Sequence, residues 1–181
     1  MYPLIKTTLT LLKAKFKAPL KFSDASVLDA RAGITDIDIF LELNNARYLN
    51  YMELGRWDFS QRVGFYTLMR RKKWGVAVGG ASVRYRRRIP FFSKFTVTTK
   101  LICHDGRWMY FLQEFHRGKN QNRKICASAL MKVCVTSSEG LVPAPEVIKE
   151  LGETDIFAEI PEWVNAWIKA ESLRPWESSP N

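Results

Sequence analysis

Residues 36–48 read DIDIFLELNNARY, and this stretch decides both the fold and the site. Asp38 lies six residues ahead of the Asn44-Asn45 pair, which opens the only long helix that the sequence predicts. Asparagine is a favoured N-cap, because its side chain accepts a hydrogen bond from a free amide of the first turn. The helix start therefore combines free N–H groups, the positive end of a dipole and a nearby carboxylate. This combination suits attack by water on a carbonyl, since the carboxylate activates the water and the amides hold the developing oxyanion.

The helix that follows this motif extends from Asn45 to about Val63, because apolar residues recur there at helical spacing, and Gly64 follows as a C-cap. Gly55 lacks a side chain within this helix, which indicates that another element packs closely against it. A strand-like segment, residues 27–39, precedes the helix. Four strand patterns come after it, over residues 76–89, 95–103, 108–116 and 125–135, and two short helices follow at residues 146–151 and 161–173.

The order of strand, long helix and four antiparallel strands predicts an α+β domain in which an antiparallel sheet wraps around one long central helix. This is the layout of the hotdog fold. We expect a single domain over residues 22–174, because a chain of 181 residues suffices for one hydrophobic core. Residues 1–21 are expected to form a basic amphipathic segment, and residues 175–181 a frayed tail.

The chain carries a formal net charge of +10, which implies acidic partners such as coenzyme phosphates, an acidic carrier protein or anionic lipid. Nucleic acid is disfavoured, because no zinc-finger or RNP-type motif appears. Cys103, Cys126 and Cys134 have no CxxC spacing, so we expect reduced, buried thiols and no metal site. His104 and His116 lie near hairpin ends, where surface positions are expected and no Ser-His-Asp triad is recognisable.

The N-terminal segment mixes lysines with apolar residues, and two interpretations stay open. Its longest uncharged run, residues 7–12, is far shorter than the roughly 20 residues of a membrane-spanning helix. A secretory signal is disfavoured, because Lys13 interrupts the run and no small-residue cleavage site follows. The segment either lies on a membrane surface or docks on the domain, and we favour docking. The expected location is cytoplasmic, with peripheral membrane attachment under the first interpretation.

Several motifs together resemble those of hotdog-fold thioesterases of the 4-hydroxybenzoyl-CoA thioesterase type. They are Asp36-Ile-Asp38, Asn44-Asn45-Ala-Arg-Tyr48-Leu, Glu53 and Arg84-Tyr-Arg-Arg-Arg88. The likeness is greatest to the branch of the thioesterase superfamily member six proteins, and it extends from about residue 25 to the C-terminal Pro-Glu-Trp helix. Several hotdog subfamilies share the Asn-Asn-x-x-Tyr core, so the motif is moderately specific.

The resemblance implies a role for each matching residue of the helix start. Asp38 would be the catalytic carboxylate, as general base or nucleophile. Backbone amides near Asn45 and Ala46 would hold the thioester oxygen, and Tyr48 and Glu53 would support the site from the helix. The chain departs from many relatives at one position.

That position is Glu42, where many relatives carry histidine. A second carboxylate four residues from Asp38 could raise a pKa by repulsion between like charges, or could point to solvent in a member without activity. Structural alternatives exist for the other carboxylates as well. Asp38 could serve as a turn or cap residue, and Glu53 could pair with Arg56 on the helix surface.

The arginine run has two interpretations of equal weight. Strand alternation would direct Arg84, Arg86 and Arg88 to one face, and Tyr85 with Arg87 to the other. Such guanidinium groups suit a clamp for the phosphates of coenzyme A. The same charges could instead protect a solvated sheet edge from aggregation.

These observations predict an acyl thioesterase that hydrolyses acyl-CoA, or an acyl carrier protein thioester, and that requires no cofactor. A thioester needs little acid assistance, since its thiol leaving group has a pKa near about 8.5. The resemblance implies a homodimer or tetramer with its sites at the subunit interface. A non-catalytic protein that binds acyl-CoA or lipid is the first alternative, and a hotdog dehydratase is a weaker one.

Overall fold

The structure is a computed structural model that describes residues 4–118 and 120–175. Its helices are α1 (Leu4–Lys15), α2 (Asn45–Arg62), α3 (Phe65–Lys72), α4 (Ala144–Glu150) and α5 (Glu162–Leu173), with short 3-10 turns at Ile34–Asp36 and Asn120–Asn122. Its strands are β1 (Ser26–Arg31), β2 (Gly75–Tyr85), β3 (Lys94–His104), β4 (Met109–Arg117), β5 (Lys124–Ser137) and β6 (Gly140–Val142). Of the predicted tail, only Pro175 lies within the described residues.

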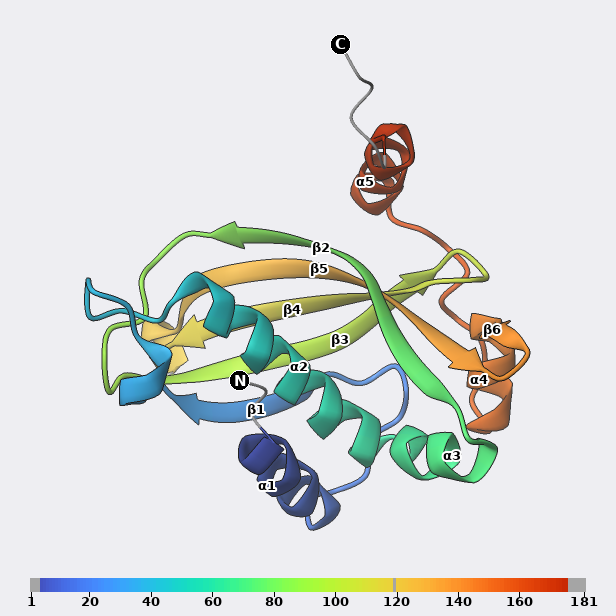
Figure 1. The fold of residues 1–181 in the computed structure, drawn as a ribbon, viewed down its shortest axis with the longest axis horizontal. Helices are drawn as coiled ribbons and strands as arrows, with labels where there is room; N and C mark the ends of the chain where they lie inside the picture. Colours follow the sequence, from blue (N-terminus) through green and yellow to red (C-terminus); the bar gives the residue numbers. More distant parts are fainter. Residues whose placement is uncertain (1–3, 119, 176–181) are drawn as a thin grey trace.

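The strands form one antiparallel sheet in the order β1-β3-β4-β5-β2, and the short strand β6 pairs with the C-terminal end of β5. The sheet curls around α2, which runs across one face, while α1 lies beside α2 and α5 stands apart from both (Figure 1). The predicted hotdog arrangement, a sheet wrapped around one long helix, is therefore confirmed. None of the helices in the described ranges combines the length and apolar content needed to cross a bilayer.

The main core fills the space between α2 and the sheet. On α2 it is formed by buried side chains such as Tyr48, Met52 and Phe59, and on the sheet by alternate residues such as Val97 and Phe115. This alternation is the pattern that the sequence predicted for the half-buried strands. Burial of each such large side chain stabilises the fold by about 1.5–3 kcal/mol, so the helix and the sheet depend on one another.

A buried polar contact sets how closely α2 approaches the sheet. The Gln113 side chain of β4 is 0% exposed, and its amide donates hydrogen bonds to the Met52 carbonyl at 2.8 Å and to the Thr99 hydroxyl at 2.7 Å. A Cβ at Gly55 would lie only 2.6 Å from that hydroxyl. The close packing that Gly55 predicted is thus present, and its two nearest neighbours are polar side chains.

The opposite face of the sheet carries a smaller core under α5. Val164 of α5 packs there with Tyr110, Leu130 and Cys103. Beside it, two tryptophan rings lie on the bare backbone of β2. A Cβ at Gly79 would come within 2.5 Å of Trp108, and one at Gly80 within 3.3 Å of Trp167. The three cysteines are buried and free, as predicted.

The surface position predicted for His104 is wrong. This side chain is buried, because the segment that follows α4 folds back over the β3–β4 hairpin. Its Nε2 lies 3.0 Å from the Asp155 carboxylate, and its Nδ1 accepts a hydrogen bond from the Gly106 amide at 3.0 Å. A partner more than fifty residues away in the chain explains why local spacing did not reveal this contact.

Two element boundaries on either side of α2 differ from the prediction. β1 ends at Arg31 and does not extend to residue 39, because the Gly33 amide donates to the Asp36 carboxylate and turns the chain out of the sheet. After α2, Gly64 adopts a left-handed φ of 80°, but it starts the additional helix α3, and Val63 is the C-cap of α2. A glycine with positive φ therefore marks a junction between two helices here.

Replacing Gly55 with alanine is expected to lower the free energy of unfolding by about 1–3 kcal/mol, because the new methyl group would collide with Thr99 and Gln113. Urea unfolding followed by circular dichroism measures this loss. In a Thr99→Ala background the same substitution should cost less, since the obstructing hydroxyl is gone. Equal losses in the two backgrounds would contradict the packing described above.

Candidate active site

Asp38 lies in the loop between the 3-10 turn and α2, and its carboxylate closes a tight turn. Its Oδ1 accepts a hydrogen bond from the Phe40 amide at 2.9 Å. Its backbone amide donates to the Glu42 carbonyl at 3.0 Å, and its carbonyl accepts from the Leu41 amide at 3.1 Å. Its Oδ2 makes no hydrogen bond to any described residue. One oxygen thus holds the side chain in place, and the other is available to a water molecule.

Neighbouring backbone segments hold this loop at the start of α2. The Leu43 amide donates to the Ile89 carbonyl at 2.8 Å, and the Phe91 amide donates to the Leu41 carbonyl at 2.9 Å. Leu41 adopts a left-handed φ of 56°, which costs a non-glycine residue about 1–2 kcal/mol. These cross-links stabilise that strained conformation and fix the turn that carries Asp38.

The N-terminus of α2 is capped by Asn44, whose Oδ1 accepts a hydrogen bond from the Ala46 amide at 2.9 Å. The predicted cap is therefore the first asparagine of the pair, and Asn45 is the first helical residue. The Ala46 amide is already engaged. The Asn45 amide has no partner in the described part of the chain, so it is the amide at this end that an oxyanion could use.

Tyr48 lies one turn into α2 and is buried beneath this helix start. Its ring packs at 5.0 Å from the Tyr85 ring and at 4.8 Å from the Phe115 ring. Burial raises the pKa of the Tyr48 phenol far above its usual value, and the neighbouring Cys126 and Glu42 raise it further. The phenol is therefore neutral at physiological pH. From β2, the Tyr85 hydroxyl reaches the Asn45 carbonyl at 3.4 Å.

Glu53, by contrast, belongs to a different part of the molecule. It lies eight residues after Asn45, about 12 Å farther along the helix axis at 1.5 Å per residue. There it borders a mostly apolar cavity of about 120 Å³ between α2, α3 and the sheet. Its Oε1 accepts a hydrogen bond from the Trp57 indole at 3.4 Å, and the same cavity is lined by Val76 and Val78 of the edge strand β2.

The four arginines of the predicted clamp are all exposed, but they do not share one strand face. β2 ends at Tyr85, because the amides of Arg86 and Arg87 both donate to the Cys126 carbonyl, at 2.8 and 3.0 Å. The predicted alternation therefore stops after Arg84. Arg87 also donates to the Ile125 carbonyl at 3.0 Å, while Arg88 provides a carbonyl to Arg117 at 3.0 Å.

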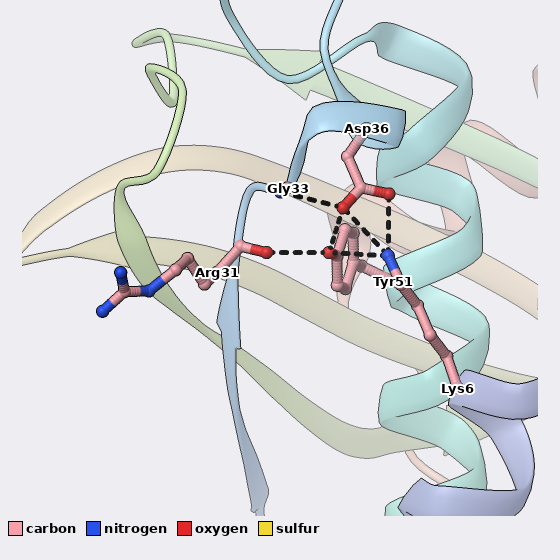
Figure 2. Close-up of polar contacts among 5 residues, drawn as sticks. All are labelled: Lys6, Arg31, Gly33, Asp36 and Tyr51. Atoms are coloured by element: carbon pink, nitrogen blue, oxygen red, sulfur yellow. Dashed lines mark hydrogen bonds and ion pairs between the residues drawn. The ribbon is translucent and has the colours of Figure 1, made fainter.

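Asp36 is the residue of this region to which the sequence assigned no role, although it belongs to the same Asp-x-Asp motif. Its carboxylate is buried and accepts hydrogen bonds from Lys6 of α1 at 2.8 Å and from the Tyr51 hydroxyl of α2 at 2.7 Å (Figure 2). The Gly33 amide is a third donor at 3.0 Å. The Tyr51 hydroxyl also lies 3.0 Å from the Arg31 carbonyl, where β1 ends. Asp36 thus joins α1, α2 and β1 directly behind the loop that carries Asp38.

An antiparallel sheet wrapped around one long helix is the hotdog fold, the fold of solved acyl-CoA-type thioesterases. Residues 32–168 match the thioesterase-like superfamily, and the chain belongs to this family. The predicted family and enzyme class are thereby confirmed.

Individual relatives agree with this assignment. Protein THEM6 of Drosophila melanogaster is 33% identical over 159 residues, which cover 87% of this chain and 79% of that protein. The long-chain acyl-CoA thioesterase FadM of Escherichia coli is 29% identical over 71 residues, or 39% of this chain and 54% of that protein. The solved structure of the probable thioesterase YbaW from Escherichia coli has the same fold, with a TM-score of 0.63 at 20% identity over 70% of this chain and 96% of that one.

The Asp36 cluster predicts a pH dependence of stability. Burial alone would raise the pKa of the Asp36 carboxyl, but the hydrogen bonds from Lys6, Tyr51 and Gly33 outweigh it and hold the pKa below 3.8. A carboxylate with a lowered pKa stabilises the fold above its unfolded pKa of about 3.9, and this contribution disappears as the pH falls through the folded value. Asp36→Asn should therefore lower the free energy of unfolding at pH 7 by about 1–3 kcal/mol.

The difference between Asp36→Asn and the unaltered protein should shrink as the pH is lowered from 7 towards 3, in urea unfolding curves measured at each pH. Asp29→Asn is the matched control, because Asp29 is an exposed carboxylate on β1 and its replacement should change little at any pH. A deficit that stays constant over this pH range would show that charge is not the basis of the effect.

Proposed function

We propose that this protein hydrolyses acyl-coenzyme A thioesters, with Asp38 as general base and the Asn45 amide as the donor that holds the thioester oxygen. The observation that carries the proposal is the shared anchoring of the two groups. The Asn44 amide donates to the Asp36 carbonyl at 2.9 Å, so the Asp-x-Asp segment is hydrogen-bonded to the cap of α2. The turn that carries Asp38 and the first residues of α2 are therefore fixed relative to one another before substrate binds.

In the proposed reaction, the free oxygen of Asp38 accepts a proton from a water molecule while the water oxygen bonds to the thioester carbon. The negative charge that develops on the carbonyl oxygen is stabilised by the Asn45 N–H and by the positive end of the α2 dipole. The C–S bond then breaks, and the thiolate leaves and takes up a proton. Because a thiolate is a good leaving group, the reaction needs no strong acid at the sulfur.

Tyr48 and Glu42 have supporting positions in this proposal. The neutral Tyr48 phenol packs under the first turn of α2 and keeps it against β2 through Tyr85. The Glu42 backbone forms an antiparallel β-bridge with Pro90, and this bridge anchors the loop that carries Asp38. We assign no proton transfer to Glu42. The alternative of a non-catalytic acyl-CoA-binding protein is motivated by this residue and by the basic N-terminal segment.

The acyl group is proposed to enter the apolar cavity beside Glu53, Trp57 and the edge strand β2. Such a cavity binds a hydrocarbon or aromatic group through burial of apolar surface. The long-chain acyl-CoA thioesterase FadM is among the relatives, which makes an aliphatic acyl-CoA the first substrate to test. The nucleotide end would meet the exposed guanidinium groups of Arg84, Arg86 and Arg88, for which phosphates are the complementary ligands.

The proposal includes a homodimer formed through β2. This strand has eleven residues and is paired only with β5 among the described strands. Its Val76, Val78 and Tyr85 side chains are 42%, 50% and 47% exposed, which is a large apolar exposure for a free sheet edge. Long apolar edges of this kind attract another strand, and a second copy offers the same strand in antiparallel register. Because β2 also borders the cavity, the acyl group would then lie at the subunit boundary.

Asp38→Asn should reduce the rate of thiol release from acyl-CoA by at least about a hundredfold, the usual scale for loss of a general base. A panel of short, medium, long and aromatic acyl-CoAs, followed by a thiol reagent, gives both the activity and the substrate class. Asp29→Asn should keep full activity, since Asp29 is an exposed residue of β1 and does not belong to the loop that carries Asp38. Acyl-pantetheine thioesters lack the nucleotide of coenzyme A. The ratio of their KM to the KM of the matching acyl-CoA measures how much the arginines contribute to substrate binding.

Full activity of a folded Asp38→Asn protein would contradict the mechanism. Tight acyl-CoA binding without turnover in the unaltered protein would favour the non-catalytic alternative.

The double substitution Ala77→Lys and Ser82→Lys should convert the dimer to a monomer, because new charges on an edge strand oppose pairing with a second copy. Neither residue lines the cavity, so the cavity itself is unchanged. Sedimentation velocity at several protein concentrations measures the oligomeric state. Ile156→Lys is the control, since Ile156 is exposed and lies outside the sheet. An oligomer that survives the double substitution would require a different interface.

A further inference from the structure

α1 packs on the domain with its apolar residues directed outward. The residues that it buries are Thr7, Thr10 and Ala14, which are small or polar. Apart from the half-buried Leu11, its large apolar side chains are instead 49% to 86% exposed, namely Leu4, Ile5, Leu9, Leu12 and the following Phe16. A helix whose only task were to cover the core would bury these side chains. The outward face therefore needs another explanation.

Four of these exposed side chains form one narrow stripe along the helix. Ile5, Leu9, Leu12 and Phe16 follow at intervals of four, three and four residues, which at about 100° per residue places them within a sector of roughly 60°. The buried threonines lie on the opposite side of the helix. We call the four exposed residues the α1 stripe.

Two ion pairs fix the rotation of α1, so the stripe cannot turn inward. Lys6 Nζ lies 2.8 Å from the Asp36 carboxylate, and Lys17 Nζ lies 2.6 Å from the Asp58 carboxylate. Both carboxylates are buried, and Asp58 is 0% exposed. Because buried carboxylates need their partners, these contacts anchor both ends of α1 in one orientation. Lys6 and Lys17 are therefore directed at the protein.

The remaining lysines of α1 flank the stripe. By the same helical spacing, Lys13 lies on one side of it and Lys15 on the other. Both are exposed, and neither has an ion pair among the described residues. An apolar stripe bordered by free cations is the arrangement of helices that lie in the interface of an anionic bilayer.

We propose that α1 binds the surface of membranes that contain anionic lipid, with the α1 stripe inserted among the acyl chains and with Lys13 and Lys15 at the headgroups. A second copy of the chain fits this surface poorly. A stripe one helix wide is smaller than the roughly 800 Å² per partner that a stable dimer buries. Its flanking lysines and the net charge of +10 would also repel an identical surface.

The membrane surface and the proposed dimer edge can be used together. α1 packs beside α2 on the side of β1, whereas β2 is at the other edge of the sheet. Pairing through β2 would leave the α1 stripe of each subunit uncovered. The membrane surface and the dimer edge can therefore be occupied at the same time.

Flotation with lipid vesicles tests this proposal on the full chain. The protein should float with phosphatidylcholine vesicles that contain roughly 30% phosphatidylserine and should stay unbound with pure phosphatidylcholine. Leu9→Ser with Leu12→Ser should lower the bound fraction at least about tenfold, because apolar insertion is lost. Lys13→Glu with Lys15→Glu should lower binding to the anionic vesicles in the same way.

The controls separate binding from folding. Leu9 and Leu12 are exposed, so their substitution should leave the thermal melting temperature and thioesterase activity on soluble substrates unchanged. Ile156→Ser removes an equally exposed apolar side chain elsewhere and should leave flotation unchanged. Absence of flotation with anionic vesicles, or flotation that survives the Leu9 and Leu12 substitutions, would overturn the proposal. Self-association that these substitutions abolish, without any vesicle binding, would assign the stripe to a second copy.

Discussion

The hydrogen bonds of one buried amide, Gln113, determine how the helix sits on the sheet. This side chain connects β4 to the backbone of α2 through the Met52 carbonyl and accepts a hydrogen bond from Arg56 at 2.8 Å. The amide can reach the helix only because position 55 has no side chain. A buried amide without partners would cost about 1–3 kcal/mol, so helix and sheet are locked in a single register. The position of every group on α2 relative to the sheet, from its first residue to its last, follows from this contact.

The register of α2 separates two chemical environments along one helix. At its N-terminus, backbone dipoles, the Asn44 cap and the Asp38 loop form a polar surface suited to a carbonyl group in reaction. Two turns farther on, the same helix borders an apolar cavity suited to an acyl chain. A thioester has these two parts in the same order, with the reactive carbonyl at one end of its acyl group. Under the proposed function, the rigid helix would set the distance between the reacting carbonyl and the cavity that receives the acyl group.

The sequence was sufficient for the parts of this arrangement that depend on local pattern. Strand alternation, helical spacing, the asparagine cap and the missing side chain at Gly55 predicted the layered fold and the position of the helix start. It failed where the partner lies far away in the chain. His104 was placed at the surface because Asp155 is remote, and Asp36 received no role because Lys6 belongs to another helix. The arginine run was extended as a strand because the double contact of Arg86 and Arg87 with Cys126 has no local signature.

The two tryptophan rings that rest on Gly79 and Gly80 bring indole groups directly against the edge strand. An indole ring changes its emission when the polarity or the stiffness of its surroundings changes. The Trp108 ring centroid also lies 4.7 Å from the ammonium group of Lys132 on the neighbouring strand β5, so its excited state is sensitive to small shifts between β2 and β5. Indole rings thus lie against β2, and the proposed joining of two such edges would change their surroundings and with them the intrinsic fluorescence, without any added label.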